Sequence, residues 1–329
     1  MDYFLEQLIL FFNAAVLAAT PLLFGTLGEI LTEKSGNLNL GVEGMMMMGA
    51  ASSISASWMY EYAAGAAASP VVSVLLAMAV GFLAGALGGL IYAAVTVTFR
   101  ANQNVTGLAL TIFGVGLGNF IGELIGARAG GYASVMDSTK SLFISGIPGL
   151  SQIPIFGKLL FSYDFMVYLA VALALCMAWF FGRTRKGLSL RSVGESPATA
   201  DAAGINVTRY KYLAICIGGG ICGLGGMYFS LARYSGTWVH NCVGGRGWIA
   251  VALVIFAAWS PIRAIWGALL FGGLSVLRLY LPISGVPTQF YDAIPFVATT
   301  LVLIITSIRQ SKERCQPKAC GVNYFREER

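Results

Sequence analysis

Apolar stretches about as long as a membrane-spanning helix recur nine times along this 329-residue chain. A helix needs about 20 apolar residues to cross the hydrocarbon core of a bilayer. Of all residues, 57% are hydrophobic and only 11% are charged, against roughly 25% charged in an ordinary soluble domain. The sequence therefore predicts an all-α, polytopic transmembrane bundle of about nine spans, within a range of eight to ten. The spans are expected at residues 8–31, 39–58, 70–99, 104–126, 163–182, 211–232, 245–260, 262–281 and 290–308.

The basic residues are unevenly distributed. Twelve of the 21 lie in two segments, six in residues 183–211 and six in residues 309–329. Cytoplasmic loops carry an excess of Lys and Arg, so both segments are predicted to be cytoplasmic. Counting spans back from them places the N-terminus and residues 127–162 outside. We expect one transmembrane domain over residues 1–310, with a cytoplasmic segment at 183–210 and a basic tail at 311–329.

The cysteines give little support for a metal site. Cys315 and Cys320 in the tail are separated by four residues, a poor match to zinc spacings, and the one histidine lies far away. Free cytosolic thiols are expected instead, with no metal and no cofactor bound by this chain.

Small residues recur at helical spacing in two of the predicted spans. Glycine at every fourth position lets helix backbones approach closely in lipid. The pattern predicts close helix packing in a compact bundle. The glycines are Gly81, Gly85 and Gly89 in one span and Gly114, Gly118, Gly122 and Gly126 in the next.

A polar segment, Thr32–Gly44, interrupts the apolar sequence, and we call it the first break. It contains Asn37, Asn39 and Glu43. Polar, irregular backbone at membrane depth is tolerated only where it is buried in protein or lines a wet cavity, and an intramembrane carboxylate is typical of a functional site. These residues are therefore candidates for lining or gating a solute path. The alternative is a simple cytoplasmic loop, with Glu43 capping the helix that follows.

A second break, Arg233–Gly247, contains several glycines together with Trp238 and His240. It also lies between two apolar helices, but the predicted topology puts it on the opposite side of the membrane. Helix, break and helix in two opposed orientations is typical of an inverted-repeat transporter. Trp238 is a candidate for the solute path, whereas a lone loop histidine is more often a surface residue.

The fourth span carries amide side chains. Asn102, Gln103 and Asn104 open it, and Asn119 and Glu123 lie four residues apart on one face. Amides can bond the heteroatoms of a polar, neutral solute without burying a charge. A path lined mainly by amides suits nucleosides or sugars better than ions. Helix capping by Asn104 and hydrogen bonds between helices remain the alternative.

The cytoplasmic segment contains the sequence G-E-S-P-A-T-A-D-A-A-G-I from Gly194 to Ile205. Ser196 is a good N-cap, Pro197 suits the first helical position and Gly204 suits the position after the helix. A short helix is predicted at Pro197–Ala203, with small side chains that could fit another protein's groove; the alternative is a plain connector. The candidate docking residues are Gly194, Glu195, Ser196, Pro197, Ala200, Asp201, Ala203 and Gly204. Bulky replacements of Ala200 or Gly204 are expected to uncouple transport without unfolding the protein.

This segment resembles the coupling motif of ATP-binding-cassette importer permeases. Three further stretches resemble the ribose/nucleoside branch of that family: T-E-K-S-G-N-L-N-L-G-V-E-G from Thr32, N-Q-N-V-T-G-L-A-L from Asn102 and G-R-G-W-I-A-V-A-L-V-I-F from Gly245. The resemblance covers about residues 20–310. It implies a multi-pass subunit of the bacterial cell membrane that imports nucleosides or related simple sugars. It also implies a cytosolic ATPase, an extracytoplasmic solute-binding lipoprotein and a second permease subunit, homologous or identical.

Several motifs are absent from the sequence. It has no G-x-x-x-x-G-K-[ST] phosphate loop, so ATP and Mg²⁺ are expected on the partner ATPase. It also has neither a nucleophile elbow nor an H-E-x-x-H motif, so the sequence does not predict an enzyme. Two other functions stay open. One is a permease for branched-chain amino acids, and the other is a stand-alone secondary transporter that couples to ions through Glu43 or Glu123.

Overall fold

The computed structural model describes residues 2–144, 146, 156–280, 287–308 and 316–325. Within these residues the chain is helical, apart from turns and one isolated β-bridge between Ser134 and Thr237. This confirms the predicted all-α class. The long helices are α1 (Asp2–Glu33), α2 (Val42–Ala64), α3 (Pro70–Ala93), α4 (Gln103–Arg128), α7 (Phe165–Arg183), α10 (Val207–Tyr228), α12 (Pro261–Tyr280) and α13 (Thr288–Ile308). The shorter helices are α5 (Asp137–Ser141), α6 (Phe156–Leu160), α8 (Arg185–Glu195), α9 (Pro197–Ala202) and α11 (Arg246–Phe256), with a 3₁₀ turn at Gly65–Ala67 and π-turns at Ala94–Thr98 and Phe229–Arg233.

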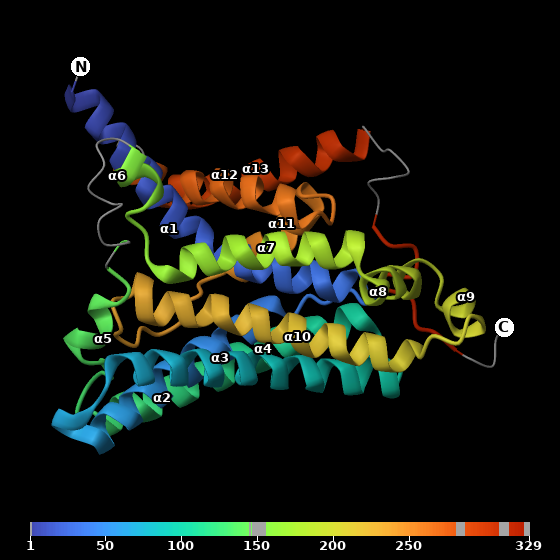
Figure 1. The fold of residues 1–329 in the computed structure, drawn as a ribbon, viewed down its shortest axis with the longest axis horizontal. Coiled ribbons are helices and arrows are strands. Elements are labelled where there is room, and N and C mark those ends of the chain that lie inside the picture. The colour runs from blue at the N-terminus through green and yellow to red at the C-terminus, as the bar shows by residue number, and fades with distance from the viewer. Residues whose placement is uncertain (1, 145, 147–155, 281–286, 309–315, 326–329) are drawn as a thin grey trace.

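The long helices lie side by side along the long axis of the molecule (Figure 1). The N-terminus, α5 and α6 lie at one end, which we call the α5 end, and α8 and α9 lie at the other, the α9 end. Residues 316–325 of the tail also pack at the α9 end, where the Ala319 amide donates to the Gly194 carbonyl at 3.0 Å. The described part of the tail therefore lies at the same end of the bundle as α8 and α9.

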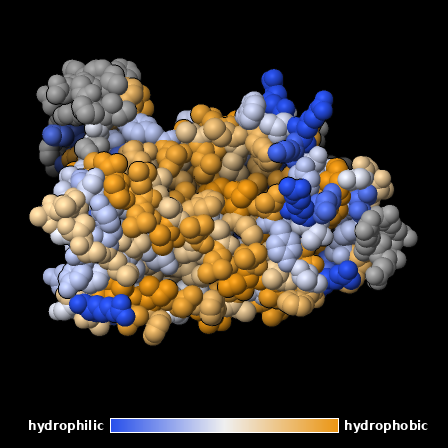
Figure 2. Space-filling model, turned by 60° about the horizontal axis from the view of Figure 1, so that its bottom comes forward, coloured by the Kyte–Doolittle hydropathy of each residue, from blue (hydrophilic) through white to orange (hydrophobic). Residues whose placement is uncertain are grey.

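The lipid-facing surface has the expected pattern. Six of the described helices are long and apolar enough to cross a membrane, namely α1, α3, α4, α7, α10 and α12. Figure 2 shows a band of apolar residues across the middle of the visible face, with hydrophilic residues towards its ends. Exposed side chains such as Leu83, Ile112 and Trp266 belong to three of these six helices. These helices place the protein in the membrane as a multi-pass bundle.

The seventh predicted span differs from the expectation. Residues 245–260 contain only the 11-residue helix α11, about 16 Å long at 1.5 Å per residue. The hydrocarbon core is about 30 Å thick, so α11 crosses roughly half of it. The helix ends at a turn in which Ala258 and Trp259 adopt positive φ. The residues of this turn are also apolar, and for this reason the predicted span extended beyond the helix.

Helix α2 lies against α3, α4 and α10 through small residues. The Gly49 and Gly85 positions both face the Gly223 backbone of α10, and Gly44 faces Gly114 of α4. A Cβ atom added at Gly223 would overlap the carbonyl oxygen of Gly81. The glycine spacing therefore predicted close packing correctly, because the backbones of these helices touch where side chains are missing.

We predict that Gly223→Ala lowers the free energy of unfolding by about 1–3 kcal/mol, because the added methyl group must push two helix backbones apart. Gly116→Ala is the matched control. Gly116 also lies in a helix but faces open space, so its replacement should be neutral or stabilising by up to about 1 kcal/mol. Thermal unfolding of both variants in detergent measures the difference, and equal midpoints would contradict the packing argument.

Candidate solute path and coupling site

The two breaks meet at the carboxylate of Glu43, in the first turn of α2. Its Oε1 accepts a hydrogen bond from the Gly245 amide at 2.7 Å, and its Oε2 accepts one from the Gly247 amide at 2.5 Å. These amides lie at the N-terminus of α11, where backbone donors lack helical partners and the helix dipole favours a negative charge. Glu43 therefore caps α11, a helix distant in sequence, and not its own helix as the alternative held.

The second break reaches Glu43 by re-entering the bundle from the α5 end. The Trp238 amide donates to the Ala133 carbonyl at 2.8 Å near that end, and a side chain at Gly122 of α4 would collide with the Trp238 ring. Further along, the Asn241 amide donates to Asn119 Oδ1 at 2.9 Å. The break thus follows α4 towards the middle of the bundle, where α11 begins.

The first break enters from the α9 end, and its backbone is bonded by side chains. The Leu38 amide donates to Gln103 Oε1 at 2.8 Å, and the Asn39 amide donates to Glu29 Oε1 at 3.0 Å. Asn39 Oδ1 in turn accepts from the Gly41 amide at 2.9 Å. The break is therefore buried irregular backbone, not a simple solvated loop.

The two breaks start at opposite ends of the bundle, as predicted, but they converge at its centre. From their meeting point α2 runs towards the α5 end, and α11 runs towards the α9 end, where the Trp259 indole donates to Glu33. The antiparallel placement of α2 and α11 agrees with an inverted repeat.

The candidate path residues fall into two groups. Asn37, Asn39, Glu43, Gln103 and Trp238 are buried in this conformation. Asn102, Asn104 and Glu123 are exposed, and Asn119 is half-buried.

The opening residues of α4 act mainly in local structure. Asn102 Oδ1 accepts from the Val105 amide at 3.1 Å, so Asn102 and not Asn104 caps the helix. Asn104 is exposed near the α9 end, far along α4 from Asn119 and Glu123. The structure therefore does not bring Asn104 together with them.

Four polar residues form a surface beside the second break, and we call it the polar wall: Asn119 and Glu123 from α4, and His240 and Asn241 from the break. His240 Nδ1 lies 3.0 Å from Glu123 Oε1, with side chains 66% and 59% exposed. Ionisable groups at membrane depth face a wet cavity or another protein chain. The sequence did not place His240 and Asn241 in the solute path. The available signal was the polar face of α4, which needs a polar segment as its neighbour in the membrane.

Helix α9 has the predicted caps. Ser196 Oγ accepts from the Thr199 amide at 3.4 Å, and Gly204 adopts a φ of +81° beyond the helix. The Ile205 amide closes the end by donating to the Ala200 carbonyl at 3.0 Å. The helix is one residue shorter than predicted, since Ala203 is its C-cap.

One candidate docking residue of α9 faces inward. Ala200 is 1% exposed and packs with Val193 and Val207, whereas Ala198 and Ala202 are exposed. The expectation that a bulky residue at Ala200 leaves the fold intact is therefore wrong. A partner protein could contact α9 only through its exposed face, which includes Ala198 and Ala202.

The other candidates divide in the same way. Gly194 is buried, and a side chain there would collide with the Lys34 carbonyl of the first break. Asp201 is half-buried and accepts from the Tyr324 hydroxyl at 2.9 Å. Glu195, Ala203 and Gly204 are exposed, and Ser196 and Pro197 are half-buried.

The tail binds to the α9 end, a role that the sequence did not reveal. Besides the contacts of Ala319 and Tyr324, Asn323 Oδ1 accepts from Gln103 Nε2 at 3.1 Å. Cys320 is a free thiol, and burial raises its pKa well above the usual range. The tail therefore connects α9, the start of α4 and the first break. No cluster of potential metal ligands occurs in the described part of the chain.

Comparisons with known proteins identify the family. The model of the branched-chain amino acid transport system / permease component family matches residues 10–305. The chain belongs to this permease family. It is 36% identical to the guanosine ABC transporter permease protein NupQ of Bacillus subtilis over 96% of both chains. It is 34% identical to the nucleoside ABC transporter permease protein NupC of Lactococcus lactis over 94% of both. It is also 35% identical to a putative glucose ABC transporter permease protein, TsgC13, of Haloferax volcanii, over 96% of this chain and 97% of the relative.

The same three organisms each contain a more distant relative. These are the permease proteins NupP, NupB and TsgB13, which are 24 to 27% identical to this chain. As in the family, the permease is the membrane subunit of an ABC transporter in the bacterial plasma membrane and not an enzyme.

We predict that Glu43→Gln lowers the free energy of unfolding of the permease by about 1–3 kcal/mol, because the amide NH₂ leaves one buried amide of α11 without an acceptor. Glu123→Gln, at an exposed carboxylate of the polar wall, should change stability by less than about 0.5 kcal/mol. Thermal unfolding of the two variants in detergent makes the comparison. A stable Glu43→Gln variant would show that α11 is held in place by other contacts.

Proposed function

We propose that this chain is the membrane-spanning permease subunit of an ABC importer for nucleosides, with simple sugars as the related substrate class. The observation that carries the proposal is the match, over more than nine-tenths of the chain, to permeases named for guanosine and for nucleosides. The polar wall supports it, since two of its four side chains are amides, which can bond ribose hydroxyls and base heteroatoms.

The outer half of the solute path is proposed to run along the polar wall. A solute released by an extracytoplasmic binding protein at the α5 end would meet His240, Glu123 and then Asn119. Deeper in the bundle the junction of Glu43 with α11 closes the way. This order follows the course of the second break along α4.

The inner half of the path is proposed to open at the first break. The Asn37 side chain is buried, and neither its Oδ1 nor its Nδ2 has a hydrogen-bond partner in the described structure. A buried polar group without a partner costs about 1–3 kcal/mol. A conformation in which Asn37 meets water or solute would recover that energy, which supports a gating role for this segment.

Coupling to ATP hydrolysis is proposed to pass through α9. ATP and Mg²⁺ would bind to a separate cytosolic ATPase, whose groove receives the exposed face of α9. Gly194, at the end of α8, contacts the Lys34 carbonyl and Gly36 of the first break. Movement of α9 would therefore be transmitted directly to the proposed inner gate.

The partner in the membrane is proposed to be a second, homologous permease. Three organisms each have two related permeases, and this chain is more similar to one of each pair, at 34–36% against 24–27% identity. Two diverged relatives per organism favour a heteromeric pair over two identical copies.

We predict that liposomes containing this chain with its ATPase, second permease and binding protein take up labelled guanosine only when ATP is supplied. Excess unlabelled nucleoside should compete with guanosine for uptake, whereas leucine should not. Competition by glucose would identify the sugar alternative. Competition by leucine alone would favour the branched-chain amino acid function. Uptake driven by an ion gradient without the ATPase would overturn the importer proposal.

We predict that Ala202→Arg, on the exposed face of α9, abolishes transport-linked ATPase stimulation while changing stability by less than about 0.5 kcal/mol. Gly182→Arg, at the end of α7, is the matched control, because it places the same side chain at an exposed position with open space around it and outside α9. ATPase activity with and without loaded binding protein measures coupling. Normal stimulation of the Ala202→Arg complex would remove α9 from the coupling site.

A further inference from the structure

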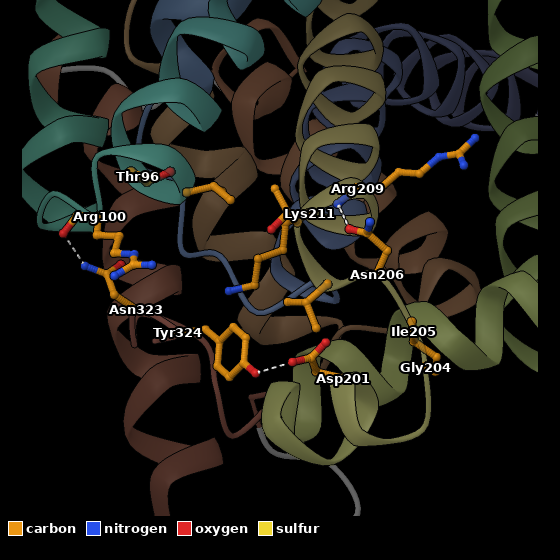
Figure 3. Close-up of a pocket in the computed structure, with 13 residues that line it drawn as sticks. Thr96, Arg100, Asp201, Gly204, Ile205, Asn206, Arg209, Lys211, Asn323 and Tyr324 are labelled. Carbon is orange, nitrogen blue, oxygen red and sulfur yellow. Dashed lines mark hydrogen bonds between the residues drawn. The ribbon is translucent and has the colours of Figure 1, made fainter. Parts of the chain in front are cut away.

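A cavity of about 640 Å³ opens at the α9 end, outside the proposed solute path. It lies between the C-terminal end of α3, the first turns of α10, the end of α9 and the tail (Figure 3). The residues that decide its chemistry are Thr96, Arg100, Asp201, Thr208, Lys211 and Tyr324.

Lys211 is the decisive residue of this cavity. Its side chain is only 3% exposed, and Figure 3 shows it reaching from α10 towards the space between Asn323 and Tyr324. Among the described residues none accepts a hydrogen bond from its ammonium group or forms an ion pair with it. A buried, unpaired ammonium is costly, so the cavity is built for an anion that pairs with Lys211.

The charged groups that the described residues contribute to the cavity are mostly cationic. Arg100 lies on one wall, with its guanidinium 4.8 Å from the Phe325 ring, and Arg209 lies at the rim and points away from the centre. Asp201 is the carboxylate on the opposite wall, and the Tyr324 hydroxyl donates to it at 2.9 Å. Among the described lining residues, Lys211 and Arg100 therefore face one carboxylate that already has a hydrogen-bond donor, and Arg209 adds a positive charge at the rim.

The position of the cavity indicates where its anion comes from. Phe99, directly after the π-turn that follows α3, and Leu213 of α10 flank it, and they are exposed apolar side chains at 76% and 50%. The cavity thus lies at the boundary between the apolar band and the basic α9 end. The cytoplasmic leaflet contains anionic lipids, and basic pockets between helices on that side suit their head groups.

We propose that this cavity binds the phosphate of an anionic phospholipid from the cytoplasmic leaflet through Lys211 and Arg100. A soluble phosphate ester presents the same chemistry and is the second source of such a group. A bound phosphate would join α3, α10 and the tail beside α9, so the position of the proposed coupling helix would depend on the surrounding lipid. The binding site itself does not depend on which solute the permease carries.

The test is lipid binding by the full-length permease, purified with its partner subunits, delipidated in detergent and titrated in native mass spectrometry. Phosphatidylglycerol should bind the wild type, and Lys211→Met should weaken its apparent affinity by about 10- to 100-fold, the effect of losing a charge-assisted hydrogen bond. Lys186→Met, at an exposed lysine of α8, should stay within about 2-fold of the wild type. Phosphatidylcholine with the same acyl chains should bind all three proteins alike.

A separate measurement guards against misfolding. Methionine keeps most of the lysine stem and removes the unpaired charge, so the delipidated Lys211→Met protein should unfold at the same temperature as the wild type or higher. Inorganic phosphate or AMP binding that is lost in Lys211→Met would support the phosphate site and assign it to a soluble ligand. Equal phosphatidylglycerol affinity in the wild type and Lys211→Met would overturn the proposal. The proposal would also be overturned if Lys211 paired with an acidic side chain of the ATPase and no phosphate compound bound to the cavity.

Discussion

The carboxylate of Glu43 at the N-terminus of α11 is the interaction on which the centre of this bundle depends. A bilayer supplies no water to irregular backbone, so each break in a spanning helix needs partners within the protein. Glu43 supplies two acceptors to the second break, while Gln103, Glu29 and Asn39 bond the first. The two unwound segments thereby become a defined junction in place of two exposed defects.

Rigidity is unevenly distributed around this junction. Helices α2, α3 and α10 touch backbone to backbone at Gly49, Gly85 and Gly223, and such contacts have little freedom to slide. Hydrogen bonds, by contrast, join the first break to its surroundings and the second break to α4. A transporter needs both properties, a fixed frame and segments whose partners can change. The polar wall and the proposed inner gate both lie among the hydrogen-bonded segments.

Local signals in the sequence predicted most of the elements. Apolar runs predicted eight of the long helices that the structure describes, six of which are long and apolar enough to span a membrane. Ser196, Pro197 and Gly204 predicted α9, because capping depends on adjacent residues. The short length of α11 was hidden, since the turn at Ala258–Trp259 is as apolar as the helix before it. The inward direction of Ala200 depends on Val193 and Val207 of neighbouring helices, and no local pattern records that packing. The pairing of Glu43 with Gly245 joins residues about 200 positions apart, beyond the reach of periodicity or spacing.

The half-length of α11 also has a consequence for biosynthesis. An 11-residue helix that begins with Arg246 is too short to be inserted across a bilayer by itself. The position of α11 within the membrane therefore depends on its acceptor on α2, which lies some 200 residues earlier in the chain. The bundle is complete only when both parts of the chain are in place. The ribosome delivers the spanning helices in order, but the central junction forms only when the two halves of the chain have come together in the lipid.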